Sequence, residues 1–174
     1  MTDDQFWDHI RAARASDPEE HAENLADRLS ELPVADILAF GRRWVDLQAR
    51  AHTRELWGAA YLINGGCEAD DLPEFLDWLI LRGEAVYTAA VTNPDGLADA
   101  VDGESECEVE CSPAYEAYCM VTEQDDYGEA LMQRFPELDA TVHEGQPPAA
   151  PWPFNPDEFR TRLPRLAALY VAVA

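Results

Sequence analysis

The stretch from Arg54 to Gly83 constrains the fold of this chain more than any other part of it. Two strongly apolar segments, 56–63 (LWGAAYLI) and 76–81 (LDWLIL), flank the sequence Asn-Gly-Gly at 64–66. The first segment is rich in Ala and has no run of β-branched residues, which favours a helix over a strand. Asn and Gly end helices readily because they adopt the left-handed conformation at low cost. The stretch therefore predicts two buried helices joined by a tight turn.

The second of these helices is predicted to begin at Asp70 or Asp71, either of which could cap it. Pro73 falls in its first turn, where a missing N–H costs nothing, and Glu74 complements the positive end of the helix dipole. Two adjacent stripes of mostly apolar side chains then follow and continue past Gly83 into a helical segment from Glu84 to Val91. One stripe consists of Phe75, Trp78, Leu79, Arg82 and Val86, and the other of Leu76, Ile80 and Tyr87. A helix that is apolar over so much of its circumference is expected at the centre of the fold.

Helix signals also recur on both sides of this stretch. The expected elements are a helix capped by Asp3 or Asp4, one beginning at Ser16-Asp17-Pro18, one from Pro33 to about His52, one or two turns near Leu97–Val101, a helix over Ser112–Thr122, one over Tyr127–Phe135, and a last helix opened by Asn155 or Asp157 and containing Phe159, Leu163, Leu166 and Tyr170. Residues 107–111 fit either a strand, because Cys and Val alternate with Glu, or an acidic helix start with cysteines at four-residue spacing.

Prolines concentrate in residues 136–156, whose composition favours extended polyproline geometry. The length of 174 residues suits one domain. The predicted fold class is therefore all-α: one compact multi-helix domain over 1–174, with a central buried helix pair and a proline-rich segment before the C-terminal helix.

The charge of the chain is strongly one-signed. The net charge is −23, all 12 basic residues are Arg, and 13 acids but no basic residue lie between Gly83 and Gln133. Such a surface repels nucleic acid and anionic membranes and attracts basic partners and divalent cations. Solubility is the simplest explanation of the charge, and a weaker alternative is that the acidic face imitates nucleic acid.

No apolar run approaches the roughly 18 residues that a membrane span needs, and the acidic N-terminus does not resemble a signal peptide. We therefore expect a cytoplasmic protein, and the Arg- and Ala-rich composition is typical of a GC-rich bacterial genome. In that compartment the four cysteines are expected as free thiols or metal ligands.

Several segments together resemble a bacterial family, domain of unknown function 4240. The central block LWGAAYLINGGCEADDLPEFLDWLILRGEAVY, the opening FWDHIRAAR, the segment SELPVADILAFGRRW and the closing FRTRLPRLAALY carry the similarity. In the family pattern an NGGC turn is followed by acids and a glycine, and this chain has Leu72 in place of that glycine. The resemblance implies an all-helical bacterial domain, and it brings no activity, substrate or catalytic residue.

The turn after the first apolar helix is the candidate pocket. Trp57, Tyr61 and Trp78 would form its walls, Cys67, Asp70 and Asp71 its mouth, and Asn64 and Arg82 would lie nearby. The adjacent helix N-terminus would lower the pKa of the Cys67 thiol, whereas the neighbouring carboxylates would raise it. The alternative is that Cys67 is a small buried side chain that fills the turn. Arg82 and Glu84 are further expected to form a partly buried ion pair, with recognition of a ligand carboxylate by Arg82 or Arg54 as the remoter hypothesis.

A metal site is the second chemical hypothesis. Cys107, Cys111 and Cys119, with His143 or Cys67, could bind zinc, although structural zinc sites typically use two close pairs of ligands. Glu68, Asp70 and Asp71 could bind a hard cation, but they more often serve as helix caps. No cofactor is predicted, and zinc or another divalent metal would be the exception.

The leading functional hypothesis is a non-catalytic protein-interaction or regulatory module that binds a partner with a basic surface through the acidic residues 83–133 or the segment PPAAPWPF. Neither nucleic acid nor a membrane is expected as a partner. The alternative is a small enzyme or a ligand- or metal-binding protein with its site at the turn Asn64–Asp71, so whether the chain is an enzyme stays open.

Overall fold

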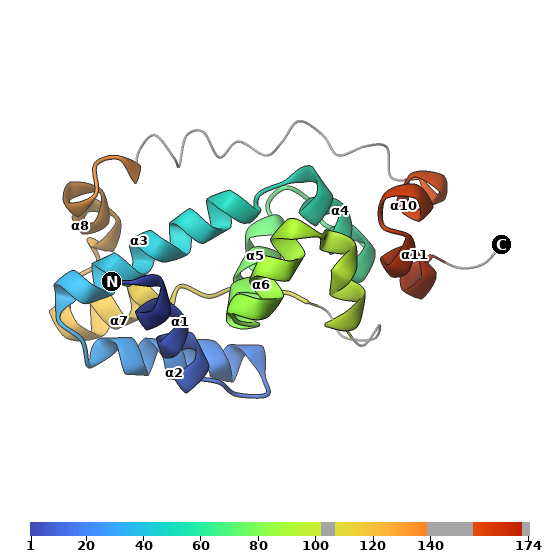
Figure 1. Ribbon diagram of the computed structural model, residues 1–174. Coiled ribbons are helices and arrows are strands. Elements are labelled where there is room, and N and C mark those ends of the chain that lie inside the picture. Colours follow the sequence, from blue (N-terminus) through green and yellow to red (C-terminus); the bar gives the residue numbers. More distant parts are fainter. Residues whose placement is uncertain (102–106, 139–154, 172–174) are drawn as a thin grey trace. The chain divides into compact units, whose positions relative to one another are not determined.

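The computed structural model describes residues 1–101, 107–138 and 155–171, and its regular structure is helical (Figure 1). These described residues contain no strand, so the all-α prediction is confirmed. None of the helices that they form combines the length and the apolar character that crossing a membrane requires.

Contacts between Cα atoms divide the chain into two compact units. Unit 1 comprises Met1–Ala49 and Glu110–Gly145, and unit 2 comprises Arg50–Val109 and Gln146–Ala174. Each unit has buried hydrophobic side chains of its own. The prediction of a single domain over 1–174 stays a prediction.

Unit 1 is built from helices of two separate stretches of the chain. Its helices are α1 (Asp3–Ala12), α2 (Pro18–Ser30), α3 (Val34–Ala51, of which residues 50 and 51 are assigned to unit 2), α7 (Pro113–Thr122) and α8 (Tyr127–Arg134). Aromatic rings join α1 to α3: the centroids of Phe6 and Phe40 are 4.4 Å apart with their planes at 25°, and both rings are fully buried. Helix α2 packs along α7.

The helix starts in unit 1 follow the capping rules, with one correction. Asp17 caps α2 as predicted, accepting a hydrogen bond from the backbone N–H of Glu20 at 3.0 Å. Asp3 and Asp4, however, lie inside the first turn of α1, and Thr2 is the cap. Thr2 and Gln5 satisfy each other's backbone N–H groups in a capping box, which leaves the two carboxylates to complement the helix dipole.

Helix α8 is held against α3 by two contacts. A Cβ on Gly41 would lie 1.8 Å from Oη of Tyr127, so only glycine allows this approach, and burial raises the pKa of the Tyr127 hydroxyl. At the other end of α8, Arg42 donates to Asp46 at 3.0 Å and to Glu137, and its guanidinium lies 5.6 Å from the Phe135 ring centroid.

Unit 2 contains the predicted central helix pair. Its helices are α4 (Arg54–Ile63), α5 (Leu72–Leu81), α6 (Glu84–Thr92), the 3-10 helix η1 (Pro94–Asp99), α10 (Pro156–Arg162) and α11 (Pro164–Tyr170). Every residue of α5 except Pro73 and Glu74 is buried, as is every residue of α4 from Leu56 to Ile63 except Tyr61. The prediction of a buried pair is confirmed.

Two helices predicted as continuous are broken in the structure. Gly83 has a φ of 93°, a conformation that L side chains rarely adopt, and it separates α5 from α6. Pro164 divides the predicted last helix into α10 and α11, because it has no N–H to donate and forces Leu163 out of the helical region. The turns expected near Leu97 form η1.

Neither the strand nor the helix considered for 107–111 is present. Residues 107–112 have no regular structure, and the N–H of Val109 donates to the carbonyl of Glu74 at 3.2 Å. Helix α7 then begins at Pro113, close to the predicted Ser112. Most of the proline-rich segment 136–156, including residues 139–154, lies outside the described residues.

Candidate functional site

The predicted turn after α4 is fixed by backbone geometry and by one buried indole. Gly65 and Gly66 have φ angles of 68° and 156°, as expected for a glycine turn that ends a helix. The indole Nε1 of Trp57 donates to the carbonyl of Cys67 at 2.9 Å, and both side chains are buried. This bond ties the turn to α4 and gives the indole its hydrogen-bond partner.

Cys67 is a free, buried cysteine. Only 6% of the residue is exposed, and its Sγ contacts the carbonyl of Glu68 at 3.5 Å. Burial, followed by the charges of Asp71 and Glu108, raises the pKa of the thiol to about 12, whereas Trp57 opposes this shift. Of the two predicted influences on the Cys67 pKa, the one from the carboxylates acts in the same direction as burial, which is the largest cause, and the geometry argues against a reactive thiolate at neutral pH.

Asn64 ties the turn to the segment that precedes α7. Its Oδ1 accepts from the N–H of Cys107 at 2.9 Å, and its Nδ2 lies 3.4 Å from the Cys107 carbonyl and 3.4 Å from Oε2 of Glu108. The Asn64 side chain thus forms hydrogen bonds with both the N–H and the C=O of Cys107, as a neighbouring strand would in a sheet. This role is structural and needs no ligand.

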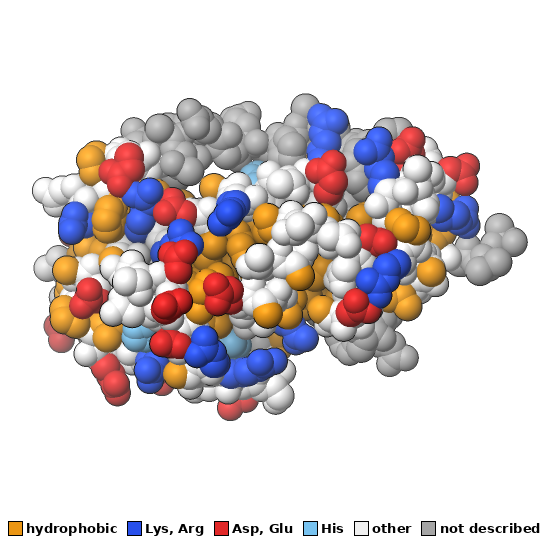
Figure 2. Space-filling model, viewed as in Figure 1, with side chains coloured by type: hydrophobic (Ala, Val, Ile, Leu, Met, Phe, Trp, Pro, Cys, Tyr) orange, Lys and Arg blue, Asp and Glu red, His pale blue; other side chains and the backbone are white. Residues whose placement is uncertain are grey.

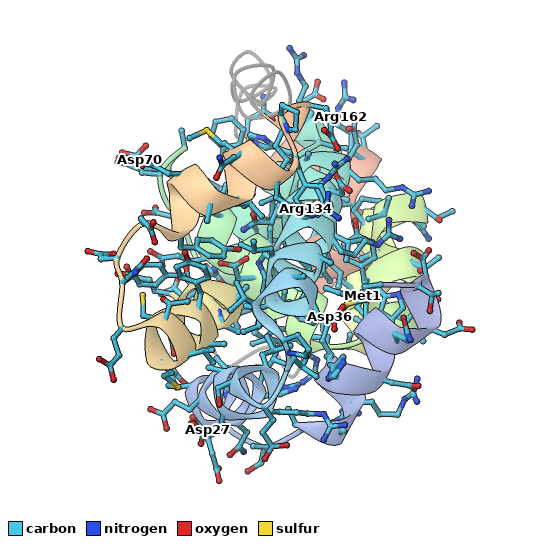
Figure 3. The ribbon with its side chains drawn as sticks, turned by 90° about the vertical axis from the view of Figure 1, so that its left-hand side faces the viewer. Met1, Asp27, Asp36, Asp70, Arg134 and Arg162 are labelled. Atoms are coloured by element: carbon cyan, nitrogen blue, oxygen red, sulfur yellow. The ribbon has the colours of Figure 1, made fainter. Side chains whose placement is uncertain are left out.

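The two aspartates of the turn have different environments. Asp71 occupies the N-cap position of α5, but its carboxylate accepts from the N–H of Glu68 at 2.7 Å and makes no capping hydrogen bond. Asp70 is exposed and projects outward (Figure 3). The cap predicted for α5 is therefore correct in position and wrong in its hydrogen bonding.

The proposed pocket walls have separate packing partners. Tyr61 stacks on Phe159 of α10 with ring centroids 6.0 Å apart, and Trp78 stacks on Phe75 at 5.6 Å. Arg82 is exposed; its guanidinium lies 5.6 Å from the Trp78 ring and donates to the Ala100 carbonyl at 3.3 Å. These contacts replace the predicted ion pair of Arg82 with Glu84.

The cysteines are free thiols in two environments. Cys67 and Cys107 are buried, whereas Cys111 and Cys119 are partly exposed. Within residues 1–101, 107–138 and 155–171, no three His, Cys, Asp or Glu side chains are grouped as a metal site requires. His143, named above as a further zinc ligand, lies outside this part of the chain.

The surface that we define as the α7–α8 surface lies within the acidic residues 83–133 that the sequence analysis singled out, but its exposed apolar side chains were not predicted. It consists of the exposed apolar side chains Tyr115, Met120, Val121 and Met132 with the acids Glu116, Glu123 and Glu129. Four of the six large hydrophobic side chains that are exposed in the described chain belong to it; the others are Met1 and Leu169. Around α8, Figure 2 shows exposed hydrophobic side chains beside both acidic and basic ones.

Helix α7 presents Tyr115 and Met120 to solvent because its other face is occupied. Ala114, Ala117 and Tyr118 are buried, at the spacing of one helix face, and α7 packs against α2. Tyr115 and Met120 lie outside that buried face and are 39% and 54% exposed. The buried face therefore fixes the direction in which α7 displays these two side chains, whereas Val121 is exposed at the end of the helix.

Two tyrosine–aspartate bonds fix the loop between α7 and α8. Tyr115 donates to Asp125 and Tyr118 donates to Asp126, each at 2.8 Å, and both rings lie edge-on to Tyr127. The bond to Asp125 is the main reason that the pKa of Tyr115 rises to about 12, so the hydroxyl stays a donor. Figure 3 views the molecule from the side on which α7 and α8 lie.

Comparison with known proteins now places the chain in a family. Residues 1–127 match the family described as protein of unknown function (DUF4240), so the chain belongs to that family, and the resemblance is confirmed for this region, which does not include the closing segment FRTRLPRLAALY. Searches of the curated proteins and of the solved structures gave no match.

Proposed function

We propose that this protein is an interaction module and that its α7–α8 surface binds a basic amphipathic helix of a partner protein. The observation that carries the proposal is the concentration of exposed Tyr, Met and Val side chains on two neighbouring helices. Large exposed apolar side chains gathered in one place are typical of interaction sites, whereas scattered ones are not. Methionine is suited to such a surface because its flexible side chain adapts to different partners.

The negative charge of the neighbouring acidic residues favours a partner with a basic surface. Residues 110–133 contain six acids, Glu110, Glu116, Glu123, Asp125, Asp126 and Glu129, and no Arg, Lys or His. A helix with Lys or Arg beside its apolar stripe would find a complementary charge on this surface, and an acidic helix would be repelled. An acidic rim around an apolar centre also favours fast association at low salt.

A synthetic peptide tests the proposal. We would titrate the full chain with a helical peptide of about 18 residues that has one Leu face and one Lys face. The double variant Met120→Ser/Met132→Ser should weaken binding about tenfold, since buried apolar anchors dominate binding energy. Leu169→Ser is the matched control, because Leu169 is equally large, 53% exposed and located in unit 2.

The control separates specific binding from general attraction to an acidic protein. A peptide that binds the control and the Met120→Ser/Met132→Ser variant with equal affinity would contradict the proposal, since net charge alone would then explain binding. The pair Glu116→Gln/Glu123→Gln should reduce the salt dependence of the affinity, whereas Glu55→Gln, an exposed carboxylate on α4, should leave it unchanged.

A further inference from the structure

Unit 2 carries two adjoining hollows that belong neither to the turn Asn64–Asp71 nor to the α7–α8 surface. The larger has a volume of about 840 Å³ and is lined by α6, η1 and Arg165 of α11. The smaller has a volume of about 280 Å³ and lies between α6 and η1. Ala85, Ala89, Gly96 and Asp99 line both, so the two hollows form one continuous trough.

Small side chains create this trough. On α6, Ala85, Thr88, Ala89 and Thr92 follow one another at the spacing of a single helix face, and all four are exposed. Gly96 adds no side chain from η1, and a Cβ at that position would meet only Nδ2 of Asn93 at 3.7 Å. The smaller hollow is lined by Ala, Val, Leu and Gly with one carboxylate, so its floor is apolar.

Helix α11, whose Arg165 lines the larger hollow, is hydrogen-bonded to η1. The carboxylate of Asp95, which is buried, accepts from the backbone N–H of Arg165 at 2.9 Å and from that of Leu166 at 3.0 Å. The guanidinium of Arg165 in turn donates to Asp99. The positive charge of Arg165 is therefore paired with Asp99 and is not available to a ligand. The same pairing holds the pKa of Asp99 below its usual range, so the Asp99 carboxylate is charged at neutral pH.

The remaining charge in the trough is negative. Glu84 lines the larger hollow, is exposed and has no ion pair or hydrogen-bond partner from the described residues. With Arg165 and Asp99 neutralising each other, Glu84 leaves the lining with a net charge of −1. The hydroxyl of Thr88 and the amide of Asn93 supply further polar contacts near the apolar floor.

We propose that this trough binds a small organic cation, an amine that carries an aromatic ring or a short alkyl group. The apolar group would occupy the smaller hollow, whose 280 Å³ exceeds the roughly 150 Å³ that suffices for benzene in an apolar protein cavity. The ammonium group would face Glu84. This site is independent of the function proposed above, because it uses other residues and another ligand.

Three probes with the same ring test the charge requirement. Phenethylamine, phenethyl alcohol and phenylacetate would be titrated into the full chain, with binding followed by backbone amide NMR shifts. The amine should shift residues of α6 and η1 and bind about fivefold more tightly than the alcohol, as expected for one exposed ion pair. Equal or tighter binding of phenylacetate, or no shift in α6 and η1 with any probe, would overturn the proposal.

Two variants test the location. Glu84→Gln should reduce the affinity for the amine about fivefold and leave that for the alcohol unchanged. Ala89→Phe should fill the hollows and abolish binding of both, and circular dichroism would show that the helix content is retained. Glu55→Gln serves as the matched control for charge. Amine binding that survives Ala89→Phe in a folded protein would place the ligand elsewhere and reject the site.

Discussion

The turn Asn64–Asp71 and the α7–α8 surface make opposite use of similar residue types. Both contain carboxylates; the turn also contains Cys67, and α7, which carries part of the α7–α8 surface, contains Cys119. In the turn, Cys67 is 6% exposed, and Trp57 and Asn64 satisfy backbone groups. On the α7–α8 surface, Met120 is 54% exposed and Met132 is 45% exposed. A conspicuous motif in the sequence therefore serves the packing of unit 2, and a less conspicuous segment carries the exposed side chains on which the proposed function rests.

Thiol chemistry gives the largest expected contrast between the two regions. With its pKa raised to about 12, Cys67 should react with iodoacetamide at pH 7.5 about a thousandfold more slowly than a freely exposed cysteine, since the thiolate fraction falls tenfold per pKa unit. Peptide mass spectrometry after timed alkylation measures this rate for each cysteine. Labelling of Cys67 as fast as that of Cys119 in the folded protein would restore the reactive-site hypothesis.

The support of the α7–α8 surface is tested by Gly41→Ala. The new Cβ would lie 1.8 Å from Oη of Tyr127. We therefore expect the free energy of unfolding, measured by urea titration, to fall by about 2–3 kcal/mol. Adding Tyr127→Phe should recover most of the loss, because the clashing hydroxyl is removed. Gly128→Ala is the matched control: its Cβ would meet nothing within 4 Å, and the variant should be as stable as the parent. A full loss in the double variant would show that helix α3 itself does not tolerate the change.

The structural role of the turn is tested by Asn64→Ala. This variant removes the partner of both backbone groups of Cys107, and we expect a loss of about 1–2 kcal/mol in the free energy of unfolding. Asn93→Ala removes an exposed amide for comparison and should change stability by no more than about 0.5 kcal/mol. Equal stability of Asn64→Ala and the parent would show that the turn is not anchored through this side chain.

The smallest expected effect is a pH dependence of stability that arises in α2, the helix packed against α7. His21 of α2 is buried, with Nε2 2.8 Å from the Ile10 carbonyl, and burial is the main cause that lowers its pKa from 6.5. The unfolded chain therefore binds this proton more readily than the folded one, and stability should fall as the pH drops below about 6.5. His21→Gln should make the decline shallower in urea titrations between pH 5 and 7. An unchanged slope would assign the effect to His9 and His52, whose pKa values are also lowered by burial.

Local chemistry predicted the helices well wherever one residue type decides the outcome. Asp17 and Asn155 cap α2 and α10, and the glycines after Asn64 end α4, because few other residues do these tasks cheaply. The breaks at Gly83 and Pro164 carried equally clear signals, but the apolar stripes on either side of each residue favoured continuity. In both cases the backbone preference prevailed over the side-chain pattern.

The candidate site was less predictable because exposure depends on tertiary packing. The sequence around Met120 and Met132 reads equally well as core, and only the packing of α7 against α2 decides which face is free. For Cys67, the competing effects on its pKa could be named from the sequence, but their balance required its burial in unit 2. The acidic character of residues 110–133 was evident from composition alone.

The contacts of Asp95 with α11 have a consequence for the limits of the family. The region matched by the family ends at residue 127, yet Phe159, Leu163 and Leu166 are buried, and the helices that carry them supply the ring stacked on Tyr61 and the amides bonded to Asp95. The region that matches the family is therefore shorter than the region whose side chains build the core of unit 2. A truncation after residue 127 would leave a buried carboxylate without its amide partners and an aromatic ring without its stacking partner, and a relative without these two helices would need its own solution to cover them.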